Sequence, residues 1–523
     1  MPGMRKAALL AVIALYLAAG GFLIVLARDQ INPDGIAYIQ NARHYLAGRY
    51  DLAVNSYWGP LLSWLLAPAL WAGVEGPLAA RLMNLAWGLG FAAAAASLTA
   101  SLAGRRRRVM GFAAAAILAL QLVAMPLTPD LMLACIIGWY AVLSLRLLSG
   151  QARPGGALLC GLLGGVAYLA KNYALPFVLA HLALTLAAGL ILRRKHPALP
   201  FRPTRFAWAA AGLALVALPW AAVISVHDGE LTIGSSGRLT RAAYAPGTGV
   251  GETPIHSLQQ LRPGRLTSWE NPLEIRYDWQ HWSPFSPAGM ARQIRVLGRN
   301  FFQAGSDLAW TAPLGLLWIG LVGWLALLRR RPGGMDARGA VLIWAGASGL
   351  MFVLGYCLIH VEPRLLFPAT VLLVPATIGL LDRLVEGVPW AAWRRKAAIL
   401  AVLAVLGMPL CGAVLGEREI AKAADNAAWT HQAAARLHLS GPVVANSWHD
   451  GLDLCFWSDA PFRGMLSEQD IPAALAGQGR CQVLIFYSRP LAQELMRDGR
   501  FRLIGEVTDQ SGWNHLWAFD FRD

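Results

Sequence analysis

Eleven stretches without Asp, Glu, Lys or Arg dominate this sequence. A helix needs about 20 apolar residues to cross the hydrocarbon core of a bilayer. The windows are 7–27, 82–104, 109–129, 131–145, 154–170, 172–192, 206–226, 308–328, 339–359, 365–381 and 397–416. The two shortest, 131–145 and 365–381, become long enough when their boundary residues are included. The pattern predicts an α-helical polytopic membrane protein with about 11 transmembrane helices.

Charged residues support this class, because they make up only 14% of the 523 residues. Soluble domains carry about 25%. The deficit excludes a soluble globular enzyme, a disordered tail protein and a disulfide-rich secreted module. The first window follows Arg5 and Lys6 and resembles a signal sequence, but it is too long for the apolar region of one. We therefore expect a retained signal anchor.

The excess of basic residues, a net charge of +15, indicates topology. Lys and Arg concentrate in the cytoplasmic loops of membrane proteins. With a cytoplasmic N-terminus, the inner loops contain Arg5, Lys6, Arg105–Arg108, Arg146, Arg153, Arg193, Arg194, Lys195, Arg202, Arg205, Arg329–Arg331, Arg338, Arg383, Arg394, Arg395 and Lys396. These are 21 of the 45 basic residues, so the charge does not indicate a nucleic-acid partner.

Three large segments then share the outer face: residues 28–81, residues 227–300 and the tail from 417. The chain has no Asn-x-Ser/Thr glycosylation sequon with x other than Pro. Both observations fit a multi-pass protein of a bacterial inner membrane, with a cytoplasmic N-terminus and a periplasmic C-terminal domain. We divide the chain into a transmembrane module, 1–416, and a soluble domain, 417–523.

The outer segments contain further predicted helices. Asn32 is a possible helix cap, with Pro33 at the first helical position. The residues that follow place Ile36, Ile39, Ala42 and Leu46 opposite Gln40, Asn41, Arg43 and His44, which predicts an amphipathic helix on the membrane surface. Residues 59–73 predict a second surface or re-entrant helix. Residues 289–303 predict a basic amphipathic helix, for which contact with lipid headgroups is the simplest interpretation.

Residues 227–300 also contain Trp269, Trp279 and Trp282. Tryptophan suits both sugar stacking and anchoring at a membrane interface, and anchoring is the default for a single residue. The tail has four short apolar runs, 442–446, 481–487, 501–507 and 515–521, with helical sequence between them. These predict a small α/β domain with a supporting or acceptor-recognition role.

Cysteines suggest one bridge. Cys455 and Cys481 are in the tail, where a periplasmic location permits a disulfide between them, and two buried free thiols are the alternative. The other four cysteines lie in the predicted spans and are expected to pack there.

A few charged residues lie at the outer ends of the predicted spans. Asp34 lies in the first outer loop, Asp130 and Lys171 lie at two outer turns, and His360, Glu362 and Arg364 mark a fourth position. Each has a simple structural interpretation, such as helix capping, snorkelling or mutual pairing. Together they predict a site for an anionic lipid and a hydroxyl group.

The order of these features resembles the GT-C superfamily of membrane glycosyltransferases. The resemblance rests on a signal anchor, an Asp opening the first outer loop, SYWGPLLSWLLA, TPDLML (128–133), GLLGGVAYLAKNYALPFVL (161–179) and EPRLLFPA (362–369). It covers about the first 380 residues. The most similar members are the family 39 type: protein O-mannosyltransferases, lipid A aminoarabinose transferases and lipopolysaccharide-core galacturonosyltransferases.

The resemblance implies transfer of a hexose or pentose from a polyprenyl-phosphate donor to a glycan, lipid or protein acceptor outside the membrane. By position, Asp34 is then the general base, and Asp130 orients the acceptor or the sugar. Lys171 and Arg364 neutralise the donor phosphate. Further site candidates are Tyr38, Trp58, His360, Glu362, Trp279 and Trp282. One displacement inverts the anomeric centre, and neither a cofactor nor a metal is implied.

Two positions depart from the family pattern. Gly35 follows Asp34 where the mannosyltransferases and aminoarabinose transferases often have an acidic residue. Trp58 and Gly59 precede Pro60 where the aminoarabinose enzymes have Glu-Lys. The second departure weighs against aminoarabinose transfer itself. A transporter or flippase of a lipid-linked sugar is the alternative, but transporters usually place charges at mid-membrane within internal repeats, and no repeat is evident.

Overall fold

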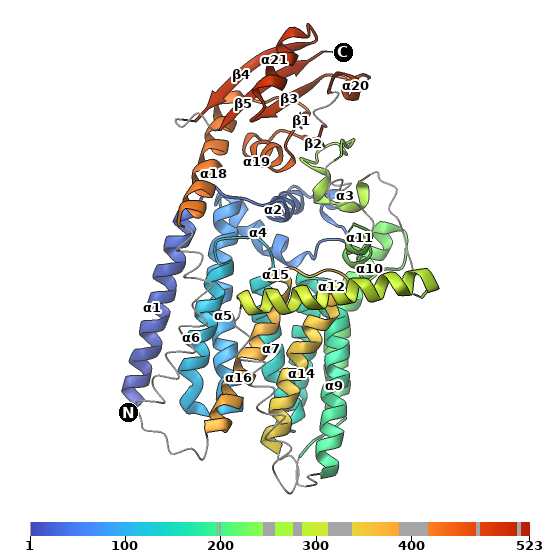
Figure 1. Ribbon diagram of the computed structural model, residues 1–523. Coiled ribbons are helices and arrows are strands. Elements are labelled where there is room, and N and C mark those ends of the chain that lie inside the picture. Colours follow the sequence, from blue (N-terminus) through green and yellow to red (C-terminus); the bar gives the residue numbers. More distant parts are fainter. Residues whose placement is uncertain are drawn as a thin grey trace.

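The fold is a bundle of long helices with a small α/β domain stacked on one end. The computed structural model describes residues 2–195, 197, 200–243, 257–275, 285–311, 337–385, 417–466, 471–477, 479–509 and 514–522. Figure 1 shows the N-terminus at the end of the bundle opposite to the α/β domain. Shorter helices lie between the bundle and the domain.

Long apolar helices build the bundle. They are α1 (Pro2–Leu26), α5 (Gly76–Ala103), α6 (Arg108–Ala119), α7 (Asp130–Leu148), α8 (Pro154–Ala170), α9 (Ala174–Lys195), α10 (Arg205–Asp228), α14 (Ala337–Cys357) and α16 (Thr370–Val385). In the described part of the chain, seven segments are long and apolar enough to cross a membrane. The mostly helical membrane architecture is thus confirmed.

The total of eleven spans stays a prediction. Nine of the predicted windows coincide with bundle helices, although α6 ends at Ala119 and is followed by the 3-10 turn η2 (Leu120–Leu122). Residues 397–416 lie outside the described residues, and so does most of 308–328.

Basic turns gather at the end of the bundle opposite to the α/β domain. The 3-10 turn η1 (Arg105–Arg107) follows α5, and Arg107 pairs with Asp382 of α16 at 2.6 Å. Arg338 of α14 reaches the same carboxylate at 3.5 Å. The predicted inner loops around 105 and 338 therefore meet at one end of the bundle.

Short helices cover the other end. They are α2 (Pro33–Leu46), α3 (Tyr50–Ala53), α4 (Leu61–Trp71) and α11 (Ser236–Ala243), together with the 3-10 turns η4 (Ser268–Glu270) and η5 (Pro272–Glu274). The expected helices at 33–46 and within 59–73 are confirmed. Pro33 is the first residue of α2, as predicted.

Most of the polar side of α2 does not face water, contrary to the expectation, and of its four polar residues Arg43 alone is exposed. Gln40, Asn41 and His44 are all buried. The reason is tertiary, since α2 contacts α4 on one side and both η4 and α19 (Trp448–Ser458) of the tail on others. Figure 1 shows α2 between the bundle and the α/β domain.

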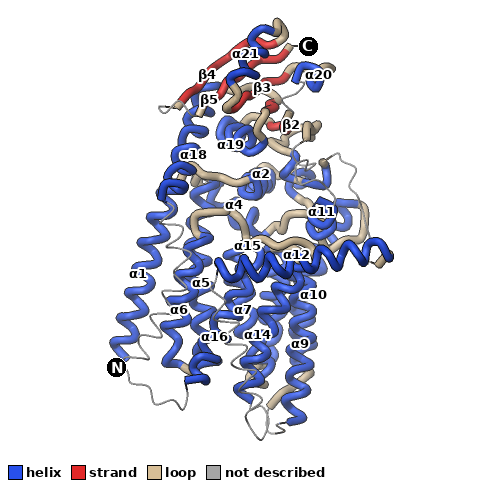
Figure 2. Tube along the Cα trace, viewed as in Figure 1, coloured by secondary structure: helices blue, strands red, loops and turns tan. Residues whose placement is uncertain are grey.

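Helix α12 (Pro287–Thr311) lies crosswise at the end of the bundle that faces the α/β domain (Figure 2). It confirms the helix expected at 289–303. Polar Asn300 is buried against α14 and donates to the Cys357 carbonyl at 3.1 Å, whereas Ile294 and Phe302 are exposed. Arg295 and Arg299 are also exposed, whereas Val296 and Ala304 are buried, so the outward surface of α12 carries both apolar and basic side chains, as in a helix at a membrane interface.

The tail forms a five-stranded sheet with the order β2-β1-β3-β5-β4. Its strands are β1 (Val443–Ala445), β2 (Phe462–Met465), β3 (Cys481–Phe486), β4 (Phe501–Thr508) and β5 (His515–Phe521). β1 is parallel to β2 and β3, and β5 is antiparallel to β3 and β4. Four strands match the predicted runs. Strand β2 was missed because its four residues include Arg463 and Gly464, which interrupt the apolar pattern.

Helices cover both faces of this sheet, and the two cysteines of the tail lie on opposite faces. Leu484 of β3 packs in the same cluster as Cys455 of α19, whereas Val483 packs with Cys481 in a second cluster. Successive side chains of a strand point to opposite faces. Both thiols are free and buried, so the predicted Cys455–Cys481 disulfide is wrong in this fold.

The two thiols are expected to resist alkylation by a maleimide at pH 7 in the folded protein and to react after denaturation. Burial raises the pKa of Cys455 well above its ordinary value, and it raises the pKa of Cys481 to about 11. Maleimides react with the thiolate, which is scarce in both cases. Peptide mass spectrometry under non-reducing conditions would contradict this prediction by detecting a peptide that links the two residues.

The α/β domain is joined to the second outer segment through the edge strand β2. The Phe462 amide donates to the Leu266 carbonyl at 2.6 Å, and the Gln259 amide donates to the Arg463 carbonyl at 2.7 Å. A side-chain contact also joins the domain to the first outer segment, since His431 Nδ1 lies 2.8 Å from Asp29 Oδ1. The domain therefore rests on residues 257–274, which lie in turn on α2.

Candidate active site

A cavity of about 300 Å³ lies at the end of the bundle that faces the α/β domain, between the bundle helices and the short helices that cover this end. Its walls come from α2, the residues before α4, the break between α8 and α9, α11, the turn η4 and the end of α14. Seven of the predicted site residues line it: Asp34, Tyr38, Trp58, Lys171, His360, Glu362 and Arg364. Segments up to 330 residues apart in the chain thus meet at one place.

Asp34 is the second residue of α2 and is held at both carboxylate oxygens. Arg364 donates from Nη1 to Asp34 Oδ2 at 2.5 Å. Trp269 donates from its indole Nε1 to Asp34 Oδ1 at 3.1 Å. The Asp34 side chain is 15% exposed, so it is desolvated in part, and it lines the cavity.

Glu362 lies between two cationic or ionisable partners just before α15 (Pro363–Leu366). Its carboxylate accepts from Arg364 Nε at 2.7 Å and contacts His360 Nε2 at 3.0 Å. Burial by itself would raise the pKa of Glu362, but the contacts with His360 and Arg364 outweigh it and hold the pKa at about 2. Glu362 is therefore an anion at physiological pH and serves as a counter-charge rather than as a proton donor.

Asp130 and Lys171, predicted separately, are joined as an ion pair. Asp130 is the first residue of α7, and its other oxygen accepts from Thr128 Oγ1 at 2.7 Å. Lys171 directly follows α8, where its charge complements the helix C-terminus. Lys171 lines the cavity, whereas the Asp130 side chain is only 1% exposed and lies behind it.

Aromatic rings form one wall of the cavity. The ring centroids of Tyr38 and Trp58 are 5.1 Å apart, and those of Trp58 and Trp269 are 5.6 Å apart. Burial, followed by the charges of Asp34 and Asp130, raises the pKa of Tyr38 well above its ordinary value, so its phenol stays neutral. These flat apolar faces are the kind of surface on which sugar rings stack.

Trp269 contacts Asp34 directly but was not among the site residues selected from the sequence. Trp279 and Trp282, which were selected, lie outside the described residues. A local signal did exist. Thr267 and Glu270 have the spacing of a helix capping box, and the structure shows both of its hydrogen bonds. That motif marks an ordered turn, and Trp269 is inside it.

The two departures from the family pattern have a steric explanation. A Cβ on Gly35 would lie 2.8 Å from the Leu127 Cβ, in the loop that precedes Asp130. A Cβ on Gly59 would lie 2.5 Å from the carbonyl oxygens of Leu169 and Ala170, at the end of α8. Both glycines therefore let backbone segments approach closely beside Asp34 and Lys171.

Gly59→Ala is expected to destabilise the protein by about 1–3 kcal/mol, a typical cost of overpacking. The two carbonyl groups that a methyl would meet belong to the backbone and cannot move aside freely. Gly155→Ala in α8 is the matched control, because a Cβ there meets no atom within 4 Å. The test is thermal unfolding in detergent, and equal midpoints for the two variants would contradict the prediction.

A second cavity shares two charged residues with the first. It is lined by Gln121, Leu122, Pro126, Glu362, Pro363, Arg364 and Phe367. Glu362 and Arg364 thus separate two spaces, one beside Asp34 and one beside the outer end of α6. In the described part of the chain, no three His, Cys, Asp or Glu side chains are grouped as metal ligands.

Comparison with solved structures identifies the fold. The structure of ArnT from Cupriavidus metallidurans bound to undecaprenyl phosphate matches at a TM-score of 0.57 and 15% identity, over 98% of this chain and 97% of that chain. The chain has the GT-C fold. The oligosaccharyltransferase AglB from Archaeoglobus fulgidus, in complex with an inhibitory peptide and a dolichol-phosphate, matches with a TM-score of 0.49, 11% identity and coverage of 98% and 74%. No protein-family model and no curated protein matches the sequence.

The GT-C fold confirms the architecture that the sequence motifs implied. The match with ArnT includes the α/β domain as well as the bundle, because it covers 98% of this chain and 97% of ArnT. The motifs at 128–133, 161–179 and 362–369 fall around the cavity, at Asp130, Lys171 and Arg364. At 15% identity the comparison concerns the fold, and the assignment of a reaction depends on the residues of the cavity.

Proposed function

We propose that this protein is a glycosyltransferase that moves a sugar from a polyprenyl-phosphate donor to a hydroxyl-bearing acceptor at the outer face of the membrane. The observation that carries the proposal is the carboxylate of Asp34, held by Arg364 in a cavity that also contains Lys171. The GT-C fold supports it, because ArnT with the same fold was solved with undecaprenyl phosphate bound.

Arg364 and Lys171 are the proposed ligands of the donor phosphate. A guanidinium binds phosphate oxygens in a bidentate manner, and an ammonium adds a compact charge. In the structure both cations are paired with carboxylates, Arg364 with Asp34 and Lys171 with Asp130. A donor phosphate would compete for them, and the release of Arg364 would free one oxygen of Asp34.

Asp34 is the proposed general base. Its carboxylate accepts the proton of the acceptor hydroxyl while the hydroxyl oxygen forms a bond to the anomeric carbon. The bond between that carbon and the phosphate oxygen breaks, and the phosphate leaves with the electron pair. One displacement inverts the anomeric centre. Because phosphate leaves as a stable anion, cations that stabilise it matter more than a general acid.

The roles of the other residues around the cavity are proposed from where they lie. Tyr38 and Trp58 are the proposed contacts of the sugar, and Asp130 is proposed to orient Lys171. The acceptor is a glycan, a lipid or a protein that reaches the cavity beneath the α/β domain. We place the chain in a bacterial inner membrane with the α/β domain in the periplasm, since its basic turns lie at the opposite end of the bundle.

Mass spectrometry of envelope lipids and glycans from a deletion strain tests this function. We expect one sugar to be missing from one acceptor and to return on complementation with the wild-type gene. An unchanged set of glycosylated products would contradict transfer. Movement of a sugar lipid by the purified protein in proteoliposomes, without a glycosylated product, would instead indicate a transporter.

A further inference from the structure

We infer that Trp269 is a positioning residue for the Asp34 carboxylate and that a buried network centred on Glu270 holds Trp269 in place. The inference rests on the role proposed above for Asp34. Its test measures the protonation of Asp34 and not sugar transfer, so the two proposals fail independently.

The first step is the contact between the indole and the carboxylate. Trp269 Nε1 lies 3.1 Å from Asp34 Oδ1, whereas Arg364 contacts the other oxygen, Oδ2. An N–H group that donates to a carboxylate stabilises its charged form and fixes its direction. Trp269 and Arg364 together therefore fix the orientation of the Asp34 carboxylate, and with it the direction of the lone pairs that remain free.

The second step is the immobilisation of Trp269 from behind. Its own amide donates to Thr267 Oγ1 at 3.3 Å, and its carbonyl accepts from Trp58 Nε1 at 3.0 Å. The ring of Trp448, in the α/β domain, packs edge to face against the indole of Trp269, with the ring centroids 6.4 Å apart. The indole is thus held by its backbone, by the neighbouring wall of the cavity and by the tail.

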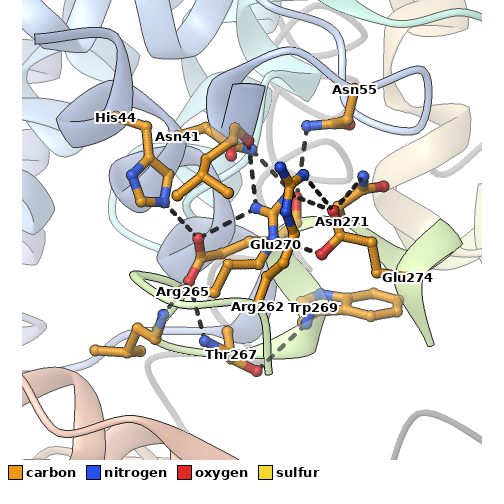
Figure 3. A network of polar contacts seen from close by, with 12 residues as sticks. Asn41, His44, Asn55, Arg262, Arg265, Thr267, Trp269, Glu270, Asn271 and Glu274 are labelled. Carbon is orange, nitrogen blue, oxygen red and sulfur yellow. Dashed lines mark hydrogen bonds and ion pairs between the residues drawn. The ribbon is translucent and has the colours of Figure 1, made fainter. Parts of the chain in front are cut away.

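The third step is the network in Figure 3, which anchors the turn that carries Trp269. Glu270 is fully buried, and its carboxylate contacts His44 Nε2 of α2 at 2.7 Å and Arg265 Nη1 at 3.4 Å. Its other oxygen accepts from the amides of Leu266 and Thr267 at 2.6 and 3.0 Å. The contact with His44 connects the turn to α2, the helix that contains Asp34, and the other contacts hold the turn to its own segment, residues 265–267.

The placement of the network suggests more than structural support. A buried ion pair is costly to desolvate and is weak evidence for stability by itself. Here the Glu270 carbonyl also accepts from Asn41 of α2 and from Asn55, at 3.4 and 3.5 Å. The network therefore fixes the distance between η4 and α2, and the hydrogen bond from Trp269 to Asp34 spans the same two elements.

The experiment follows the labelling of Asp34 by dicyclohexylcarbodiimide, a reagent for protonated carboxyl groups, as a function of pH. The full-length protein is used in lipid nanodiscs, and peptide mass spectrometry quantifies the peptide that contains Asp34. Arg364 faces the same carboxylate. The other ionisable groups of the described residues that line the cavity or lie behind it are Asp130, Glu362, His360, Lys171, Tyr38, Tyr57, Tyr173 and Tyr356. None of these is changed in the variants.

Trp269→Phe is expected to raise the labelling midpoint by about one pH unit, because a carboxylate that loses one donated hydrogen bond stays protonated to higher pH. Glu270→Gln is expected to shift the midpoint in the same direction. In the double variant the shift should equal that of Trp269→Phe, since Glu270 acts through the indole. Trp71→Phe and Glu230→Gln, at an exposed ring and an exposed ion pair, are controls that should not shift it.

Three results would overturn the inference. They are a wild-type midpoint in Trp269→Phe, an additive shift in the double variant, and a Glu270→Gln protein that is less stable but keeps the wild-type midpoint. The last result would make the network structural only. If Glu270→Gln does not fold, Thr267→Val takes its place, because it removes the hydroxyl that accepts from the Trp269 amide, and the same three criteria apply.

Discussion

Asp34→Asn is expected to reduce the rate of sugar transfer by a factor of about 100 to 10,000, the usual contribution of a general base. Asparagine has the same shape as aspartate but cannot accept the proton of the acceptor hydroxyl. The fold should survive, because Arg364 keeps Glu362 as a partner at 2.7 Å after the Asp34 charge is lost. The measurement is the amount of glycosylated acceptor in a deletion strain complemented with each variant.

Asp51→Asn is the matched control for this substitution. Asp51 lies in the same outer segment, is exposed, pairs with Arg262 at 3.1 Å and does not line the cavity that contains Asp34. It should leave transfer unchanged. Full transfer by Asp34→Asn, at equal amounts of protein in the membrane, would remove Asp34 as the base.

Arg265→Ala is expected to lower the free energy of unfolding by about 3–5 kcal/mol, the usual cost of removing one partner from a buried ion pair. The Arg265 side chain is 0% exposed and binds both oxygens of Glu274, at 2.7 and 2.8 Å. It also donates to the Leu52 carbonyl at 3.2 Å. Its removal leaves the fully buried Glu270 without this cation. Pulse proteolysis in urea, with the protein in detergent micelles, measures the change.

Arg262→Ala separates this effect from the general loss of a positive charge. Arg262 contacts Glu274 and Asp51 in the same region, but its side chain is 46% exposed. Exposed ion pairs contribute about 0–1 kcal/mol. Similar destabilisation by the two variants would show that burial of the Arg265–Glu270 pair is not what stabilises the outer segment.

Most charged residues of the cavity could be located from the sequence, because charged residues are rare next to membrane-spanning segments. Asp34, Asp130, Lys171 and Arg364 were conspicuous between apolar windows, and topology placed them on one side. The order of the spans did not show which of these groups pair. Only the fold brings Arg364 to Asp34, across 330 residues of chain, and puts Asp130 behind Lys171 instead of in the cavity wall.

Residues of the outer segments were harder to predict, because their burial depends on what covers them. The sequence of α2 predicted an amphipathic helix on the membrane surface, yet His44 and Asn41 of its polar side are buried and contact Glu270 of η4. Trp269 was expected to be an interfacial anchor, yet its indole N–H donates a hydrogen bond to Asp34. In each case the decisive neighbour is more than 200 residues away in the chain.

The tail shows the same division. Its strands were recognisable from local apolar runs, but the cysteine pairing was not, since Cys455 and Cys481 face opposite sides of the sheet. By itself, the sequence determined the helical membrane architecture and located the charged groups at the ends of the spans, because hydropathy and charge act locally along the chain. Tertiary structure alone decided the pairing of those charges, the burial of α2 and the position of Trp269, because desolvation and ion pairing depend on contacts between distant segments.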